Sequence, residues 1–106
     1  MKIKIIITTT DSDNAANKIA QYLVKEKLSP CVQITPNIQS IYSWKGKLEK
    51  SKEILIVFKT IPEKVEECKK LILKYHNYDT PEFIVMDGEI LNDKYRDWFI
   101  NNFQEI

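Results

Sequence analysis

The hydrophobic pattern opens with a strand and continues into an amphipathic helix. Residues 2–9 alternate at first and are then β-branched throughout, which is typical of a strand that becomes buried in mid-sheet. Asp11, Ser12 and Asp13 follow, and each is a good N-cap. Apolar residues then recur every three or four positions, which predicts a helix that ends at Ser29-Pro30. This stripe consists of Ala16, Ile19, Ala20, Leu23, Val24 and Leu28.

A long β-hairpin follows. Residues 31–44 are rich in β-forming residues, Lys45-Gly46 provides the turn, and residues 47–60 form the partner strand. Pro36 cannot donate to a strand ladder, so we expect a bulge or a sheet edge there.

The hairpin is longer than one core requires. Its partner strand is polar over residues 48–52 and apolar over 54–58, so we expect a buried base and an exposed tip. About 13 strand residues span roughly 43 Å. An arm of this length is most easily explained if it packs on another subunit.

A second helix is predicted after the hairpin. Residues 60–63 have a capping-box pattern, with Pro62 in the first helical turn. The apolar stripe of this helix consists of Val65, Cys68, Leu71, Ile72 and Tyr75.

The remaining pattern predicts one more strand and one more helix. Residues 82–87 contain a short strand that we expect to be buried, and Asn92 or Asp93 caps a helix with Tyr95, Trp98, Phe99 and Phe103 on one face. The order is therefore β-α-β-β-α-β plus a C-terminal helix. It predicts an α+β, ferredoxin-like fold with a four-stranded antiparallel sheet and helices on one face. The other face would be an exposed apolar patch, which favours oligomerisation.

Composition indicates one domain over residues 1–106 and excludes several classes of function. Lys and Arg number 16 and Asp and Glu 15, so no overall field attracts nucleic acid or a membrane, and we expect neither as a partner. No apolar stretch approaches the ~20 residues of a membrane helix. Cys31 and Cys68 form no CxxC pair, which favours free thiols in a cytoplasmic protein. Only Gly46 and Gly88 occur, which excludes Gly-rich phosphate loops.

His76 is the only histidine and the main candidate for a chemical role. Residues 76–82 place one imidazole, one phenol and two carboxylates within seven positions. Imidazole is a common ligand of copper and zinc, so one interpretation is a metal or small-ligand site. The other is a histidine at a helix C-terminus that interacts with the helix dipole. Because transition-metal sites usually need three or four ligands, a neighbouring subunit would have to supply the rest.

The remaining candidates have simple structural interpretations as well. Cys31 is either a buried structural thiol or a soft metal ligand, and Cys68 belongs to the helical core stripe. Trp44 beside an exposed turn is most economically a subunit contact. Asp11 and Asp13 are explained by helix capping. No self-contained catalytic machinery is evident.

Four strings carry a family resemblance: Cys-Val-Gln-Ile at 31–34, Ser-Ile-Tyr-Ser-Trp-Lys-Gly-Lys at 40–47, the segment 53–60, and His-Asn-Tyr-Asp-Thr-Pro-Glu at 76–82. Together they resemble the CutA divalent-cation tolerance proteins. The segment 95–98 is similar to the last helix of that family, so the resemblance runs nearly end to end. The Ser-x-Tyr-x-Trp-x-Gly and His-x-Tyr-x-x-Pro-Glu patterns are specific in combination.

The resemblance implies a ferredoxin-like protomer in a tight homotrimer, with the hairpin strands joining sheets between subunits. It also implies a link to copper and other divalent cations, and a general similarity to trimeric PII-type signalling proteins. The chain departs from the family at Gln33, Asn77 and Asp79. Thr8 stands where some bacterial relatives carry a cysteine implicated in copper binding, which leaves His76 as the one matching metal ligand.

The leading hypothesis is a non-enzymatic homotrimer that binds copper, another divalent cation or a small ligand at intersubunit clefts. The metal ligand would be His76, and the cleft would also contain Cys31, Trp44, Lys59, Tyr78 and Glu82.

Three alternatives differ in class. A PII-like regulatory module would bind an anionic metabolite or a partner protein and would depend more on Lys45 and Lys59. An acylphosphatase-type hydrolase would need an anion-cradling loop, but residues 8–12 contain neither Arg nor Gly. An RNA-binding module would need aromatic pairs on the middle strands, where Phe58 stands alone.

Overall fold

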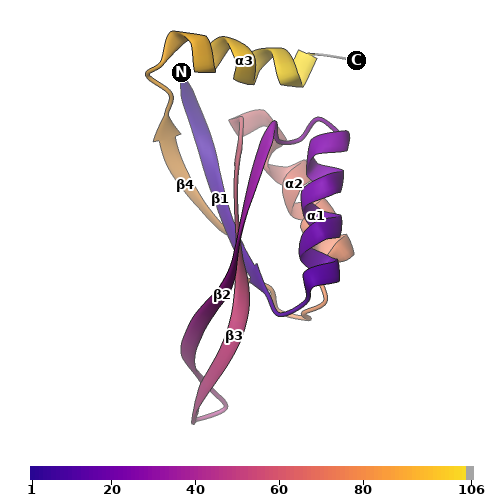
Figure 1. Ribbon diagram of the computed structural model, residues 1–106, viewed down its shortest axis with the longest axis vertical. Helices are drawn as coiled ribbons and strands as arrows, with labels where there is room; N and C mark the ends of the chain where they lie inside the picture. The colour runs from indigo at the N-terminus through magenta and orange to yellow at the C-terminus, as the bar shows by residue number, and fades with distance from the viewer. Residues whose placement is uncertain (105–106) are drawn as a thin grey trace.

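A four-stranded antiparallel sheet carries two helices side by side on one face, and a third helix crosses its end (Figure 1). The computed structural model describes residues 1–104. Its elements are β1 (Lys2–Thr10), α1 (Asp13–Lys25), β2 (Cys31–Trp44), β3 (Lys47–Thr60), the 3₁₀ turn η1 (Pro62–Lys64), α2 (Val65–Tyr75), β4 (Ile84–Glu89) and α3 (Asp93–Gln104). The strand order β2-β3-β1-β4 confirms the predicted ferredoxin-like α+β fold.

The main core lies between the sheet and the helices α1 and α2. Ile6, Ile56 and Phe58 project from the central strands and are fully buried. They pack against helix residues that include Ala16, Ile19, Leu23, Cys68, Leu71 and Ile72. Each large apolar side chain buried in this way contributes about 1.5–3 kcal/mol. Burial also raises the pKa of the Cys68 thiol to about 11, so this thiol stays protonated at neutral pH.

The first helix ends earlier than its apolar stripe predicts. Helix α1 stops at Lys25, before the predicted end at Ser29-Pro30. Lys27 has a left-handed φ of 60°, and the N–H of Leu28 donates to the Leu23 carbonyl at 2.9 Å. These features are those of a Schellman motif, which satisfies the last helical carbonyls. Leu28 therefore joins the core from the helix cap rather than from the helix.

The capping box predicted at residues 60–63 does not form. The Thr60 hydroxyl donates to the Leu28 carbonyl at 2.6 Å, and Ile61 occupies the N-cap position without a side-chain hydrogen bond. Pro62 does begin the helical turn, as predicted. A tertiary hydrogen bond has thus replaced a local one.

The hairpin β2–β3 projects beyond the other strands (Figure 1). Strand β3 pairs with both neighbours over residues 55–59 but only with β2 over its outer half. The ladder is irregular between Thr35 and Ile38, which confirms the bulge predicted at Pro36 on this edge strand. Both turn residues, at positions 45 and 46, have positive φ, as a type I′ hairpin turn requires.

Strand β4 is not the buried strand that the sequence predicts. Ile84, Val85 and Met86 are 39–46% exposed in the single chain. The physical reason is position, because β4 is an edge strand that pairs only with β1, whereas α1 packs over the other three strands. These apolar side chains form an uncovered border of the sheet.

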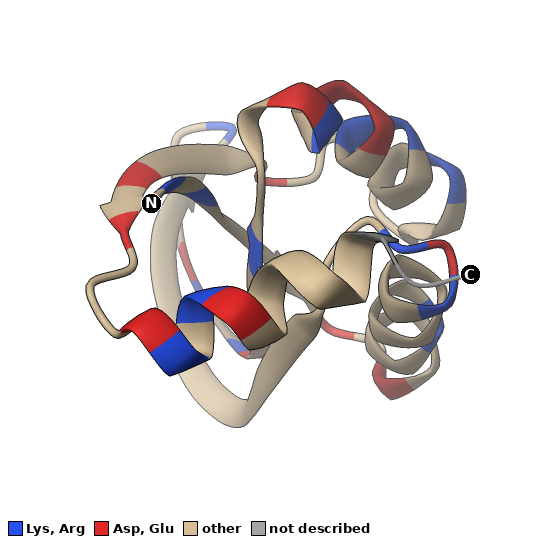
Figure 2. Cartoon of the chain, turned by 90° about the horizontal axis from the view of Figure 1, so that it is seen from above, with Lys and Arg blue, Asp and Glu red and all other residues tan. Residues whose placement is uncertain are grey.

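Helix α3 forms a second, smaller core at the end of the sheet. Phe99 is fully buried and packs with Ile3 and Ile90. The Asn92 side chain caps the helix by accepting a hydrogen bond from the Tyr95 N–H at 2.9 Å. Seen from above, the charged residues of α3 gather in its first half (Figure 2).

Replacing Thr8 by valine should stabilise the protein. The Thr8 hydroxyl is fully buried and makes no hydrogen bond within residues 1–104. Thr8→Val keeps the β-branched shape and removes this desolvated group, so the free energy of unfolding should rise by about 1 kcal/mol. Urea denaturation measures this change. Thr8→Ala, which also loses a methyl group, serves as the control and should destabilise. A Thr8→Val protein less stable than wild type would contradict the view that the buried Thr8 hydroxyl makes no hydrogen bond.

Candidate functional site

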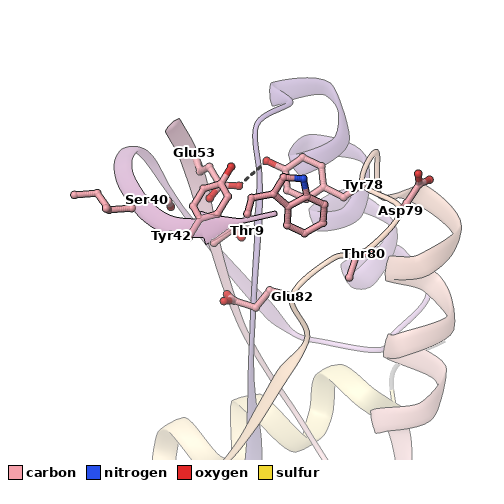
Figure 3. A pocket seen from close by; sticks show the side chains of 10 residues that line it. Thr9, Ser40, Tyr42, Glu53, Tyr78, Asp79, Thr80 and Glu82 are labelled. Atoms are coloured by element: carbon pink, nitrogen blue, oxygen red, sulfur yellow. Dashed lines mark hydrogen bonds between the residues drawn. The ribbon is translucent and has the colours of Figure 1, made fainter. Parts of the chain in front are cut away.

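A pocket of about 760 Å³ opens between the outer half of the hairpin and the segment that joins α2 to β4 (Figure 3). The hairpin contributes Ser40, Ile41, Tyr42, Trp44 and Glu53 to its lining, and the segment contributes Tyr78, Asp79, Thr80 and Glu82. Thr9, near the end of β1, completes it. The pocket therefore joins three parts of the chain that lie far apart in the sequence.

The hydrogen bond between Tyr78 and Glu53 ties the segment to the hairpin. The phenol donates to the Glu53 carboxylate at 2.5 Å, as the dashed line in Figure 3 shows. Glu53 is only 9% exposed. Burial first, and then the bond to Glu53, raise the pKa of Tyr78 well above its usual value. The phenol therefore remains a hydrogen-bond donor at neutral pH.

His76 lies next to the pocket, and both of its ring nitrogens are engaged. Nε2 is 2.8 Å from the Thr9 carbonyl, and Nδ1 lies 3.0 Å from the Tyr78 backbone nitrogen, whose N–H donates to it. The carbonyl can only accept, so Nε2 carries the proton and the ring is neutral. The His76 ring also packs at a tilt against the Tyr78 ring, with centroids 4.9 Å apart. A metal ion at His76 would have to displace one of these two hydrogen bonds.

Asn77 attaches the same segment to the end of β1. Its side-chain oxygen accepts a hydrogen bond from the Thr10 hydroxyl at 2.5 Å, and its side-chain nitrogen donates to Asp11 at 2.7 Å. Asn77 is one of the positions where this chain departs from the family pattern. Its amide both donates and accepts, so one side chain bonds to two residues that follow each other at the end of β1.

The single chain divides the predicted cleft residues into two groups. Trp44, Tyr78 and Glu82 line the pocket together. Cys31 and Lys59 face each other as cross-strand partners at the base of the hairpin. Cys31 and Trp44 are the first and last of the 14 residues of β2, which corresponds to roughly 40 Å of strand.

Sequence reasoning missed three pocket residues whose positions do carry information. Glu53 directly precedes the apolar run 54–58. A charged residue at the border of a buried strand segment is a signal that could have marked it. Ser40 and Tyr42 alternate with Trp44, so all three share one face of β2.

Within residues 1–104 the structure has no group of three or more His, Cys, Asp or Glu side chains arranged to hold a metal ion. Thr8, at the position of the cysteine found in some relatives, is fully buried. The described helices include none long and apolar enough to cross a membrane.

Comparison with known proteins establishes the family. Residues 4–102 match the model of the CutA1 divalent ion tolerance proteins. The chain belongs to the CutA1 family. The divalent-cation tolerance protein CutA of Thermus thermophilus is 32% identical over 99 residues, which cover 93% of this chain and 96% of that protein.

Other CutA relatives are longer than this chain. The chloroplastic CutA of Arabidopsis thaliana is 35% identical over 92% of this chain and 54% of its own length. The CutA homolog of Xenopus laevis is 40% identical over 85% of this chain and 60% of its own length. The chain thus spans only a little more than half of these two relatives.

Solved CutA structures share the fold. The Thermus thermophilus protein superposes with a TM-score of 0.88 and 32% identity, covering 96% of this chain and 98% of that one. CutA1 from Ehrlichia chaffeensis gives a TM-score of 0.88 and 33% identity, covering 95% and 94%. A relative from Archaeoglobus fulgidus is described as periplasmic and the Arabidopsis one as chloroplastic, so a cytoplasmic location stays a prediction for this chain.

The Tyr78–Glu53 hydrogen bond should contribute measurably to stability. Tyr78→Phe leaves a buried carboxylate without its donor, so the free energy of unfolding should fall by about 1–3 kcal/mol in urea denaturation. Tyr42→Phe is the matched control, because the Tyr42 hydroxyl makes no hydrogen bond within the described residues, and it should change stability less. Equal effects of the two substitutions would show that the bond contributes nothing.

The same bond predicts a pH dependence at alkaline pH. The pKa of Tyr78 is higher in the folded state than the value of about 10 in the unfolded chain. Above pH ~10 the folded state therefore holds more protons than the unfolded state, and stability falls as the pH rises. Urea denaturation between about pH 9 and 11 should show a steeper loss for wild type than for Tyr78→Phe. Parallel curves would be inconsistent with the raised pKa of Tyr78.

Proposed function

We propose that the protein is a non-enzymatic homotrimer that binds copper, another divalent cation or a small ligand at clefts between subunits. The observation that carries this proposal is the division of the cleft residues within one chain. Trp44, Tyr78 and Glu82 line one pocket, while Cys31 and Lys59 lie at the far end of the same strand pair. A neighbouring copy whose hairpin base lies against this pocket would complete the site.

Exposed apolar side chains support assembly from several copies. On the outer hairpin, Ile41 is 58% exposed, Trp44 54% and Leu48 74%. The half-exposed residues of β4 add a second apolar strip along a sheet edge. Contiguous apolar surface and an open strand edge are typical of sites that associate with another chain. The hairpin would therefore be the arm that joins the subunits.

The donor set suits a metal only when two chains contribute. His76 offers nitrogen, Glu82 oxygen and Cys31 sulfur, and nitrogen and sulfur are ligand types that copper accepts. Cys31 lies at the base of the hairpin opposite Lys59, whereas His76 follows α2 and contacts the Thr9 carbonyl. A metal would thus bind across a subunit boundary and would bind weakly to an isolated chain.

Binding rather than catalysis fits the reactive groups. Both His76 nitrogens are hydrogen-bonded, and the Cys68 thiol is buried and protonated. Neither is placed to act as a general base or a nucleophile. We expect the protein to act in the cytoplasm, with no nucleic acid or membrane as a partner.

Equilibrium dialysis with Cu²⁺ and Zn²⁺ tests the metal-binding role. His76→Ala and Cys31→Ser should each weaken metal uptake by about tenfold or more, because each removes a proposed ligand. Glu49→Gln is the control for a change of charge on β3 outside the pocket and should bind like wild type. Equal uptake by wild type and His76→Ala would remove His76 from the site.

A further inference from the structure

The side chains around the pocket have the chemistry of a site for an organic cation. Glu53, Asp79 and Glu82 supply carboxylates, and Tyr42, Trp44 and Tyr78 supply aromatic rings. Within the described part of the chain, no lysine, arginine or histidine lines the pocket. Carboxylates pair with a cation, and aromatic faces attract it through the ring quadrupole.

The Glu53 carboxylate places negative charge beside the aromatic rings of the pocket. It is about nine-tenths buried, and one oxygen accepts the Tyr78 hydrogen bond. Its other oxygen receives no hydrogen bond and no ion pair from residues 1–104, but it is not fully enclosed, so it can accept a hydrogen bond from a ligand in the pocket. A cation that donates to this carboxylate would form a charge-assisted hydrogen bond in a largely buried setting. Figure 3 shows this carboxylate inside the pocket, close to the rings of Tyr42 and Tyr78.

The size and lining of the pocket favour a small organic molecule over a bare metal ion. Its volume of about 760 Å³ falls within the roughly 300–1,000 Å³ of small-molecule pockets. The three carboxylates do not form a metal-binding cluster among the described residues. Aromatic rings favour alkylammonium and guanidinium groups, whose hydrocarbon parts also bury apolar area.

We propose that this pocket binds a small molecule that carries an ammonium or guanidinium group. The cation lies against Glu53, and the hydrocarbon part packs on Tyr42 and Trp44. The site shares Trp44, Tyr78 and Glu82 with the proposed cleft, but it requires neither a metal nor His76. The same cation could also be supplied by a basic side chain of a second copy.

Isothermal titration calorimetry of the full chain with benzylammonium chloride tests this proposal. Benzyl alcohol is the neutral control of the same shape, and magnesium chloride is the inorganic control. We expect benzylammonium to bind at least about tenfold more tightly than either.

Substitutions then locate the site. Glu53→Gln keeps an acceptor for Tyr78 and removes the charge, so benzylammonium should bind about tenfold or more weakly. Glu82→Gln should also weaken binding. The Glu82 side chain makes no hydrogen bond within the described residues, so this substitution removes a charge without disturbing the Tyr78–Glu53 bond. Tyr42→Leu should weaken it by removing a ring. Glu49 lies on β3 with Glu53 but outside the pocket. Glu49→Gln is therefore the control and should bind benzylammonium like wild type.

The outcomes separate the two sources of the cation. Binding that is lost in Glu53→Gln supports a free small molecule. Absence of binding to wild type, together with a lower oligomer mass for Glu53→Gln by light scattering, assigns the cation to a second copy. Absence of both effects, or equal binding by wild type and Glu53→Gln, overturns the proposal. Copper uptake by wild type, with no amine binding and no change of oligomer mass in Glu53→Gln, would overturn it while leaving the proposed function intact. Amine binding by a wild-type protein that takes up neither copper nor zinc would support this proposal and contradict the metal-binding role.

Discussion

The division of β3 into two halves is the constraint on which the rest of the structure depends. Over residues 55–59 the strand has partners on both sides and supplies Ile56 and Phe58 to the core. Its outer half has only β2 beside it, so those residues cannot be buried by this chain alone. Glu53 lies at the boundary, deep enough to be buried and near enough to the arm to face the pocket. Core, arm and pocket are therefore consequences of where β1 ends.

Hydrogen bonds from residues 76–78 make the opposite wall of the pocket. His76 bonds to the Thr9 carbonyl, Asn77 to Thr10 and Asp11, and Tyr78 to Glu53. These bonds hold a segment without regular structure against the end of β1. Such attachment pre-organises Tyr78 and its neighbours, which reduces the entropy lost when a ligand binds. The single histidine thus has a structural role in each chain, whatever ligand the cleft holds.

Much of the fold followed from the sequence because its determinants are local. β-Forming residues and the Lys45-Gly46 turn predicted the hairpin, and Pro36 predicted the irregular ladder. The early end of α1 depends on a left-handed Lys27, and the missing Thr60 cap depends on the distant Leu28 carbonyl. Neither the left-handed conformation of Lys27 nor the bond of Thr60 to Leu28 can be predicted from the neighbouring residues in the sequence. The site was predictable only in part, because the burial of Glu53 requires three segments to meet, and because Cys31 and Lys59 lie far from the pocket within one chain.

The central claim is that neighbouring copies of the chain cover the hairpin arm and complete the cleft. Multi-angle light scattering of the full chain at micromolar concentration tests it most directly. Three chains of 12.5 kDa each should elute as one particle with three times the mass of the monomer. A mass equal to one chain would contradict the claim, because the arm and the divided cleft would then remain open to solvent.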